Sequence, residues 1–181
     1  MSASVNKSEI IYQGKVFKLL RENVTLDNGV TTDLDLIDHP GASAMVALSN
    51  ESNILLLKQY RHAMGDFIWE IPAGTLDQDE APLDCAKREL IEETGFAAHA
   101  WEKLGEITPV PGYSNERIHV FLASHLERAT QNLDKDEVLR VHEVPLTDAM
   151  GMIHDGSIQD GKTISGLFMA THWLNRNNPL P

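Results

Sequence analysis

The alternation of apolar and polar positions along the first forty residues predicts a small antiparallel sheet. Three apolar runs separated by turn residues read as strands, at 10–13, 16–26 and 30–37. The sequence Asp-Asn-Gly at 27–29 is typical of a hairpin turn. His-Pro-Gly at 39–41 separates this section from the rest of the chain. We therefore expect an N-terminal antiparallel sheet over residues 1–40 and a second unit over residues 41–181.

The second unit mixes short apolar strands with helical patterns. Strands are predicted at 44–48, 54–60, 67–71, 101–108, 118–124 and 138–144. Helices are predicted at 80–94, 147–154 and 165–175, with a turn at 49–53 and a frayed tail at 177–181. Thr147 is the expected N-cap of the middle helix. The last helix has an apolar stripe made of Leu167, Phe168, Ala170, Thr171 and Leu174. The order of elements indicates a mixed α/β fold.

The helix predicted at 80–94 carries three carboxylates on one side. Glu89, Glu92 and Glu93 are related by i, i+3 and i+4, so their side chains emerge together. Like charges placed this way repel, and that cost is explained if a cation sits among them. Carboxylate oxygens suit the hard ions Mg²⁺ and Mn²⁺. A solvated acidic helix face is the alternative interpretation.

The residues around these carboxylates form a longer pattern. From Gly74 to Phe96 the chain reads G-x5-E-x7-R-E-U-x-E-E-x-G-U, where U is a bulky apolar residue. Arg88 lies one turn before Glu92 and can hold its carboxylate, and Gly95 is suited to end the helix in a left-handed conformation. The pattern resembles the Nudix box, the signature of hydrolases that cut a nucleoside diphosphate linked to another moiety. The resemblance implies an α/β/α sandwich around a mixed sheet, preceded here by the N-terminal antiparallel sheet.

The resemblance also implies roles for residues of the box. Glu89 and Glu93 correspond to the main metal ligands, Glu92 to a further ligand or hydrogen-bonding partner, and the backbone carbonyl of Ala73 to another ligand. Arg88 is placed in the catalytic set, although a structural role is expected more than a catalytic one. The expected cofactor is Mg²⁺ or Mn²⁺.

A general base is expected from a loop after the box. In the related enzymes a glutamate of a mobile loop often takes the proton of the attacking water. The acidic loop at 131–137 precedes a predicted strand, and aligning that strand places Glu137 at the base position. Glu92 and Asp136 are the alternatives, and a solvated loop without a catalytic role is another.

Features outside the box resemble ADP-ribose pyrophosphatases and related nucleoside-diphosphate-sugar hydrolases. Pro111 lies sixteen residues beyond Gly95 and is followed by Gly112, although an ordinary turn would also account for this pair. Candidate substrate-binding residues are Arg61 for a phosphate, Glu70 and Glu116 for ribose hydroxyls or the outer metal shell, and Phe17 or Tyr12 for stacking on the base. A surface ion pair for Arg61 and core packing for the two aromatic residues are the alternatives. Related ADP-ribose enzymes often carry a basic residue in the strand before the His-Pro-Gly turn, where this chain has Thr-Thr-Asp-Leu-Asp at 31–35.

Composition narrows the choice of partners. The net charge of −12 disfavours a broad nucleic-acid-binding surface. No apolar run reaches membrane-spanning length, and a single cysteine excludes an internal disulfide, so a cytoplasmic location is expected. The resemblance implies a homodimer in which the N-terminal sheet crosses to the partner and lends residues to its site.

Three other functions stay open on the sequence alone. A different nucleotide sugar, such as GDP-mannose, is an alternative substrate, because sugar and base are held by loops outside the box. A non-catalytic module that senses ADP-ribose is a second alternative, although such modules usually lose box carboxylates that are intact here. A nucleotide-triphosphate sanitiser is a third, although those chains are usually shorter and lack the N-terminal sheet.

Overall fold

A computed structural model of the chain describes residues 3–49 and 53–177. The N-terminal section forms the predicted antiparallel sheet, with β1 (Ser4–Gln13), β2 (Lys18–Thr25) and β3 (Thr31–Asp38) in that order. The predicted hairpin turn is present, and its Gly29 has a φ of +83°. Residues 50–52 of the predicted turn and 178–181 of the predicted tail lie outside the described residues.

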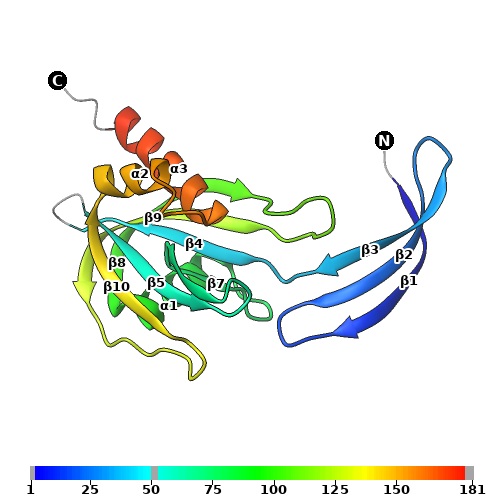
Figure 1. Cartoon of the computed structure of the whole chain (residues 1–181), viewed down its shortest axis with the longest axis horizontal. Coiled ribbons are helices and arrows are strands. Elements are labelled where there is room, and N and C mark those ends of the chain that lie inside the picture. Colours follow the sequence, from blue (N-terminus) through cyan, green and yellow to red (C-terminus); the bar gives the residue numbers. More distant parts are fainter. Residues whose placement is uncertain (1–2, 50–52, 178–181) are drawn as a thin grey trace.

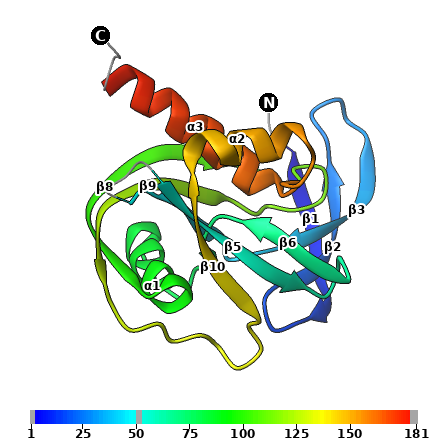
Figure 2. The same cartoon turned by 60° about the vertical axis from the view of Figure 1, so that its left-hand side comes forward.

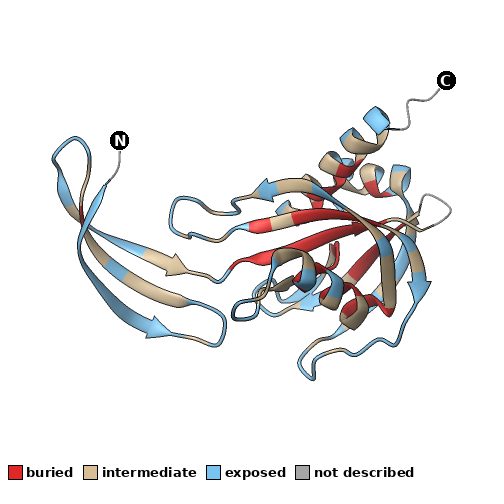
Figure 3. Cartoon of the chain, turned by 180° about the vertical axis from the view of Figure 1, so that it is seen from behind, coloured by how far each residue is buried: buried red, intermediate tan, exposed pale blue. Residues whose placement is uncertain are grey.

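The N-terminal sheet extends away from the rest of the chain (Figure 1). The end of β3 contacts a loop of the second unit, where the Ile37 N–H donates to the Tyr113 carbonyl at 2.8 Å. The Asn115 side chain accepts from the His39 N–H at 2.8 Å. Side chains of this sheet are almost all exposed or only half-buried, in contrast to the body of the molecule (Figure 3).

The body contains two sheets side by side. The first has the order β7-β4-β9-β8, with β4 (Ala42–Ala47) parallel to β9 (Ile118–Arg128) and antiparallel to β7 (Ala73–Thr75). Its last strand, β8 (Phe96–Ile107), is antiparallel to β9. The second sheet is antiparallel with the order β10-β5-β6, from β10 (Leu139–Pro145), β5 (Asn53–Arg61) and β6 (Asp66–Glu70).

Helices cover both sides of these sheets. Successive residues of β4 point to opposite sides: Ala44 and Val46 pack with residues of α2 (Leu146–His154) and α3 (Gly161–Asn177). Met45 and Ala47 pack with residues of α1 (Pro82–Thr94). Figure 2 shows α1 on one side and the α2–α3 pair on the other. The α/β/α sandwich with a mixed sheet is therefore confirmed.

The predicted boundaries differ from the structure at several places. The short β7 was not predicted, because three residues carry no periodic signal. β1 and β8 begin earlier than expected, at Ser4 and Phe96, since polar or small residues on half-exposed strands do not alternate. α3 begins at Gly161 rather than 165, and the carboxylate of Asp160 accepts the Thr163 N–H as its cap.

Two details of the predicted helices were wrong. Thr147 is not the N-cap of α2, because the helix begins at Leu146 and the cap position is Pro145. Phe168 does not join the buried stripe of α3 and is 49% exposed, whereas Leu167 and Ala170 are fully buried. The stripe is narrower than predicted because only one edge of α3 faces the sheet.

Candidate active site

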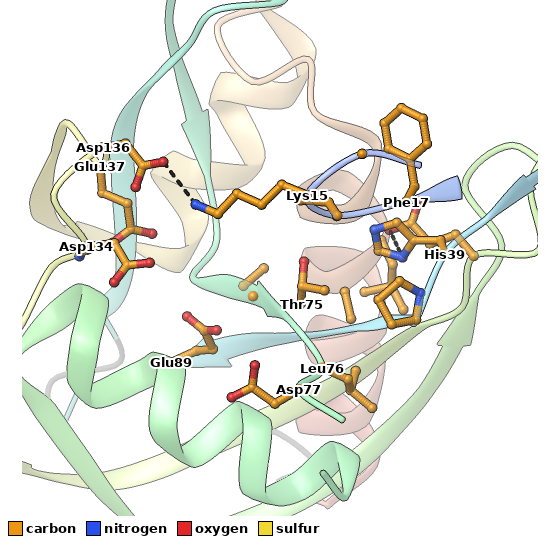
Figure 4. Close-up of a pocket in the computed structure, with 18 of the residues that line it drawn as sticks. Lys15, Phe17, His39, Thr75, Leu76, Asp77, Glu89, Asp134, Asp136 and Glu137 are labelled. Carbon is orange, nitrogen blue, oxygen red and sulfur yellow. Dashed lines mark hydrogen bonds and ion pairs between the residues drawn. The ribbon is translucent and has the colours of Figure 1, made fainter. Parts of the chain in front are cut away.

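An open cavity of about 1110 Å³ lies between the box helix, the N-terminal sheet and the loop before β10. Figure 4 shows Glu89 of α1, Glu137 of that loop and Lys15 of the β1–β2 turn around the same space. The volume is above the range of about 300–1000 Å³ that is usual for small-molecule pockets, so a nucleotide sugar has room. The site is therefore built from segments that are far apart in the sequence.

Arg88 ties the box together. Its Nε and Nη2 donate to the two oxygens of Glu80 at 2.9 and 2.8 Å, and Nη1 donates to Glu89 at 2.6 Å and to Glu92 at 3.0 Å. The charge-assisted bonds to Glu80 hold the pKa of its carboxyl down to about 2. The guanidinium therefore fixes the loop before α1 and two of the three box carboxylates at once, as expected of a structural arginine.

Glu93 is buried beneath the cavity with little to balance its charge. The residue is only 1% exposed, and Oε2 accepts the Ala73 N–H at 2.9 Å. Burial raises the pKa of this carboxyl well above its ordinary value, and the nearby Glu89 adds to the effect. Burial likewise raises the pKa of Glu89, against the opposing hydrogen bond from Arg88.

Gly74 allows the chain to pass directly over Glu89. A Cβ built on Gly74 would lie 1.9 Å from the carboxylate carbon and from Oε1 of Glu89. Any larger residue at position 74 would force the Glu89 side chain to shift. The backbone of 73–75 and the carboxylates of α1 are thus held within contact distance at the cavity floor.

The donor set suits a divalent metal ion. Glu89 and Glu93 are hard oxygen donors that burial penalises while they are charged, so a cation beside them would relieve that penalty. Among the residues that the structure describes, no three acidic, histidine or cysteine side chains already converge as a ready ligand group. Arg88 engages Glu89 and Glu92 instead, so their oxygens would be shared between the guanidinium and a metal.

A family model described as "NUDIX domain" matches residues 39–167. This chain is a Nudix protein. Its relatives include an ADP-ribose pyrophosphatase of Bacillus subtilis, 40% identical over 157 residues (86% of this chain and 85% of the relative). A methanol dehydrogenase activator of Bacillus methanolicus is 39% identical over 160 residues (87% and 86%). A GDP-mannose pyrophosphatase of Citrobacter koseri is 35% identical over 170 residues (81% and 88%).

The Nudix fold is also found among solved structures. The crystal structure of an ADP compounds hydrolase superposes with a TM-score of 0.86, covering 99% of this chain and 98% of that one at 20% identity. At this identity the likeness supports the fold alone. The N-terminal sheet is included in this superposition, because almost the whole chain is covered.

Eight of the predicted site residues line the cavity, whereas the predicted metal ligand Glu93 does not. The eight are Phe17, Arg61, Ala73, Arg88, Glu89, Glu92, Glu116 and Glu137. Glu137 lies two residues before the start of β10. Its Oε2 accepts the Asp134 N–H at 3.0 Å, and this hydrogen bond closes a turn in the loop. Phe17 is 39% exposed and lies on the side of the cavity near His39 (Figure 4).

Other predicted residues lie elsewhere. Pro111 and Gly112 form a turn that begins at Val110 and contacts the end of β3, away from the residues that line the cavity. Tyr12 is 59% exposed on β1 and is also outside the lining. Glu70 is not among the residues that line the cavity, and its side chain is only 4% exposed. The substrate contacts expected of these residues stay predictions.

Two lysines that line the cavity were not predicted from the sequence. Lys15 reaches from the β1–β2 turn to Asp136 at 3.3 Å, across the cavity from the box (Figure 4). Lys162 lies in the first turn of α3 and pairs with Glu70 and Asp160. Asp160 is a typical helix-capping residue, so the sequence could have indicated that α3 begins at Gly161. The neighbouring residues do not indicate that this end of the helix lies at the cavity.

Proposed function

We propose that this chain hydrolyses the diphosphate bond of nucleoside diphosphate sugars, with ADP-ribose as the preferred substrate and AMP and ribose 5-phosphate as products. The observation that carries the proposal is a pair of buried carboxylates at a cavity large enough for such a substrate: Glu89 lines the cavity, and Glu93 is buried on the same helix without lining it. The ADP-ribose pyrophosphatase relative at 40% identity supports the choice of sugar nucleotide.

The box residues would hold the metal. A divalent cation on Glu89, Glu93 and the Ala73 carbonyl, with Glu92 as a further donor, would offset phosphate charge and lower the pKa of bound water. Arg88 holds Glu89 and Glu92 in place through the bonds at 2.6 and 3.0 Å. The buried Glu93 is held by the Ala73 N–H, so the ligand set is fixed from both the helix and the loop.

The proton and the substrate would be handled from the opposite side of the cavity. Glu137 accepts the proton of the attacking water, because it lies on the cavity wall and Arg88 does not hold its carboxylate. The start of its loop is tied to the box helix, since the Asn132 N–H donates to the Glu92 carbonyl at 3.1 Å. Arg61 binds substrate phosphate, since its planar guanidinium suits phosphate oxygens and its side chain is 40% exposed at the cavity. Phe17 offers an aromatic face near the mouth for the base.

GDP-mannose is the second candidate substrate. The relative from Citrobacter koseri carries that name at 35% identity. The residues at 31–35 that differ from many ADP-ribose enzymes lie on β3, where Asp35 pairs with Arg21 at 2.9 Å on the exposed sheet, outside the cavity lining. Their effect on sugar choice would therefore have to come through a second copy of the chain.

We propose that residues 1–40 form a dimerisation sheet. The register of β1, β2 and β3 places Ile10, Leu20 and Leu36 side by side, and Leu34 lies two residues before Leu36 on the same face. Ile10 and Leu34 are 56% and 48% exposed. An apolar stripe of this kind on a projecting sheet would be covered by a second copy of this chain.

The expected setting rests on composition and the described structure. Among the residues described, no helix is both long and apolar enough to cross a membrane. Cys85 is buried and unpaired, which fits a reducing compartment such as the cytoplasm. The net charge of −12 argues against nucleic acid as a partner.

A product assay with Mg²⁺ tests the proposal. ADP-ribose, GDP-mannose, UDP-glucose and a nucleoside triphosphate are offered separately at equal concentration, and the nucleotide products are resolved by ion-exchange chromatography. AMP as the dominant product from ADP-ribose supports the proposal. GMP from GDP-mannose at an equal or higher rate selects the second candidate. Turnover of the triphosphate alone would overturn both.

A further inference from the structure

Lys162 lines the cavity, but the proposed function gives it no role in binding the metal or in transferring the proton. It is the second residue of α3, and its side chain is 13% exposed. Its ammonium group donates to Oε1 of Glu70 and to Oδ2 of Asp160, the second at 2.9 Å. A lysine this deeply placed is unusual unless it is paired.

Glu70 divides its two oxygens between two cations. Oε1 accepts from Lys162, while Oε2 accepts from the Nε of Arg61 at 2.7 Å. The Glu70 side chain is 4% exposed and the Arg61 side chain 40%. Among the residues described, Arg61 donates only through Nε, and its two terminal Nη groups have no hydrogen-bond partner.

When an arginine and a carboxylate have no other partner, they commonly form two parallel hydrogen bonds. Here Oε1 of Glu70 accepts from Lys162, and Arg61 donates to Glu70 through Nε alone. We propose that Lys162 is a positioning residue, which keeps Glu70 from binding Arg61 through both oxygens and so leaves the Nη groups of Arg61 facing the diphosphate of the substrate. The inference rests on the proposed function, because it deepens the role given there to Arg61.

The first turn of α3 fixes Lys162 in this place. Oδ2 of Asp160 accepts the Thr163 N–H at 3.0 Å and the Thr163 hydroxyl at 2.6 Å. The same hydroxyl accepts the Ile71 N–H at 2.8 Å, directly after Glu70 in the chain. The helix start and the strand end that carries Glu70 are thus joined by hydrogen bonds, so Lys162 has little freedom to leave Glu70.

A double-mutant cycle tests the inference. Lys162→Met, Arg61→Met and the double variant are compared with the wild type by steady-state kinetics on ADP-ribose at saturating Mg²⁺. Lys162→Met is expected to raise KM about tenfold while kcat changes less than about twofold, because phosphate binding is lost and the metal site is intact. In the Arg61→Met background the same substitution is expected to change KM by less than about twofold.

Three results would overturn the inference. One is a wild-type KM in Lys162→Met. Another is an equal rise of KM in both backgrounds, which would mean that Lys162 contacts substrate itself or only supports the fold. The third is a large fall in kcat. Lys103→Met is the matched control, since Lys103 is an exposed strand lysine paired with Glu106 outside the cavity lining.

Two additions keep the test decisive. If Lys162→Met does not fold, Lys162→Gln, which keeps a donor for Glu70, is used in the same cycle, with a smaller expected rise of KM and again none in the Arg61→Met background. The affinity for magnesium pyrophosphate is measured by calorimetry on the same variants, because it needs no turnover. A wild type that does not cut ADP-ribose but shows this coupling would refute the proposed substrate and leave the role of Lys162 intact.

Discussion

Replacing Gly74 by alanine would test whether the close approach of the box loop to Glu89 is needed for catalysis. The added Cβ would lie 1.9 Å from Cδ and Oε1 of Glu89, where ordinary contact begins at 3.4 Å. The carboxylate would therefore have to move by about 1.5 Å. It has little room, because its side chain is 11% exposed and Arg88 holds Oε1 at 2.6 Å.

A displacement of about 1 Å at a reacting centre costs roughly 10²-fold in rate. We therefore expect Gly74→Ala to lower kcat on ADP-ribose by about 10²-fold or more and to raise the Mg²⁺ concentration needed for half-maximal rate. The backbone of Gly74 does not have a positive φ, so alanine is permitted there by conformation and only the contact is at issue.

The assay is initial rate against Mg²⁺ concentration, with circular dichroism and a thermal melt to verify folding. Gly151→Ala in α2 is the control, because a Cβ there meets nothing within 4 Å. It is expected to keep wild-type kinetics and to stabilise the helix by about 0.5–1 kcal/mol. A folded Gly74→Ala variant with wild-type kcat and an unchanged Mg²⁺ dependence would refute the reasoning.

The same geometry predicts four other outcomes. Glu137→Gln should lower kcat by about 10²–10⁴-fold with little change in KM, measured by steady-state kinetics, and full turnover would remove it as the base. Glu80 has a pKa held near 2, below the ordinary 4.5, so its stabilising effect is present above pH 4.5 and is lost as the pH falls through about 2. Glu80→Gln should therefore melt below the wild type at pH 7, with the gap closing near pH 2. Mg²⁺ should raise the melting temperature more at pH 8 than at pH 5, because burial raises the pKa of Glu93 and protons then compete with the metal; an equal shift at both pH values would contradict this. Leu36→Asp should turn a dimer into a monomer by light scattering, and an unchanged mass would place the interface elsewhere.

The box helix was predictable because its information is local. Glu89, Glu92 and Glu93 share one side of a helix by spacing alone, and Gly95 ends that helix with a φ of +70°, as its position indicated. The apolar strands β4 and β5 were also recognisable, since both are largely buried on two faces and read as nearly continuous apolar runs. These elements carry the fold and the candidate metal donors.

The other wall of the cavity was less predictable because it depends on distant contacts. Lys162 meets Glu70 across 92 positions of sequence, and only the packing of α3 against the end of β6 brings them together. Lys15 reaches the loop of Glu137 across 121 positions through an exposed ion pair. Neither contact leaves a periodic signal, so sequence patterns could suggest Arg61 as a phosphate ligand but not what positions it.

The measurement that tests the central claim most directly is the release of AMP from ADP-ribose as Mg²⁺ is titrated, in the wild type and in Glu93→Gln. We predict equal amounts of AMP and ribose 5-phosphate from the wild type and no activity after removal of metal with EDTA. The rate should fall by several orders of magnitude in the variant, which keeps the hydrogen bond from Ala73 but loses the charge. Wild-type hydrolysis that persists without a divalent metal, or a Glu93→Gln variant as active as the wild type, would contradict the claim that the box carboxylates hold a catalytic metal.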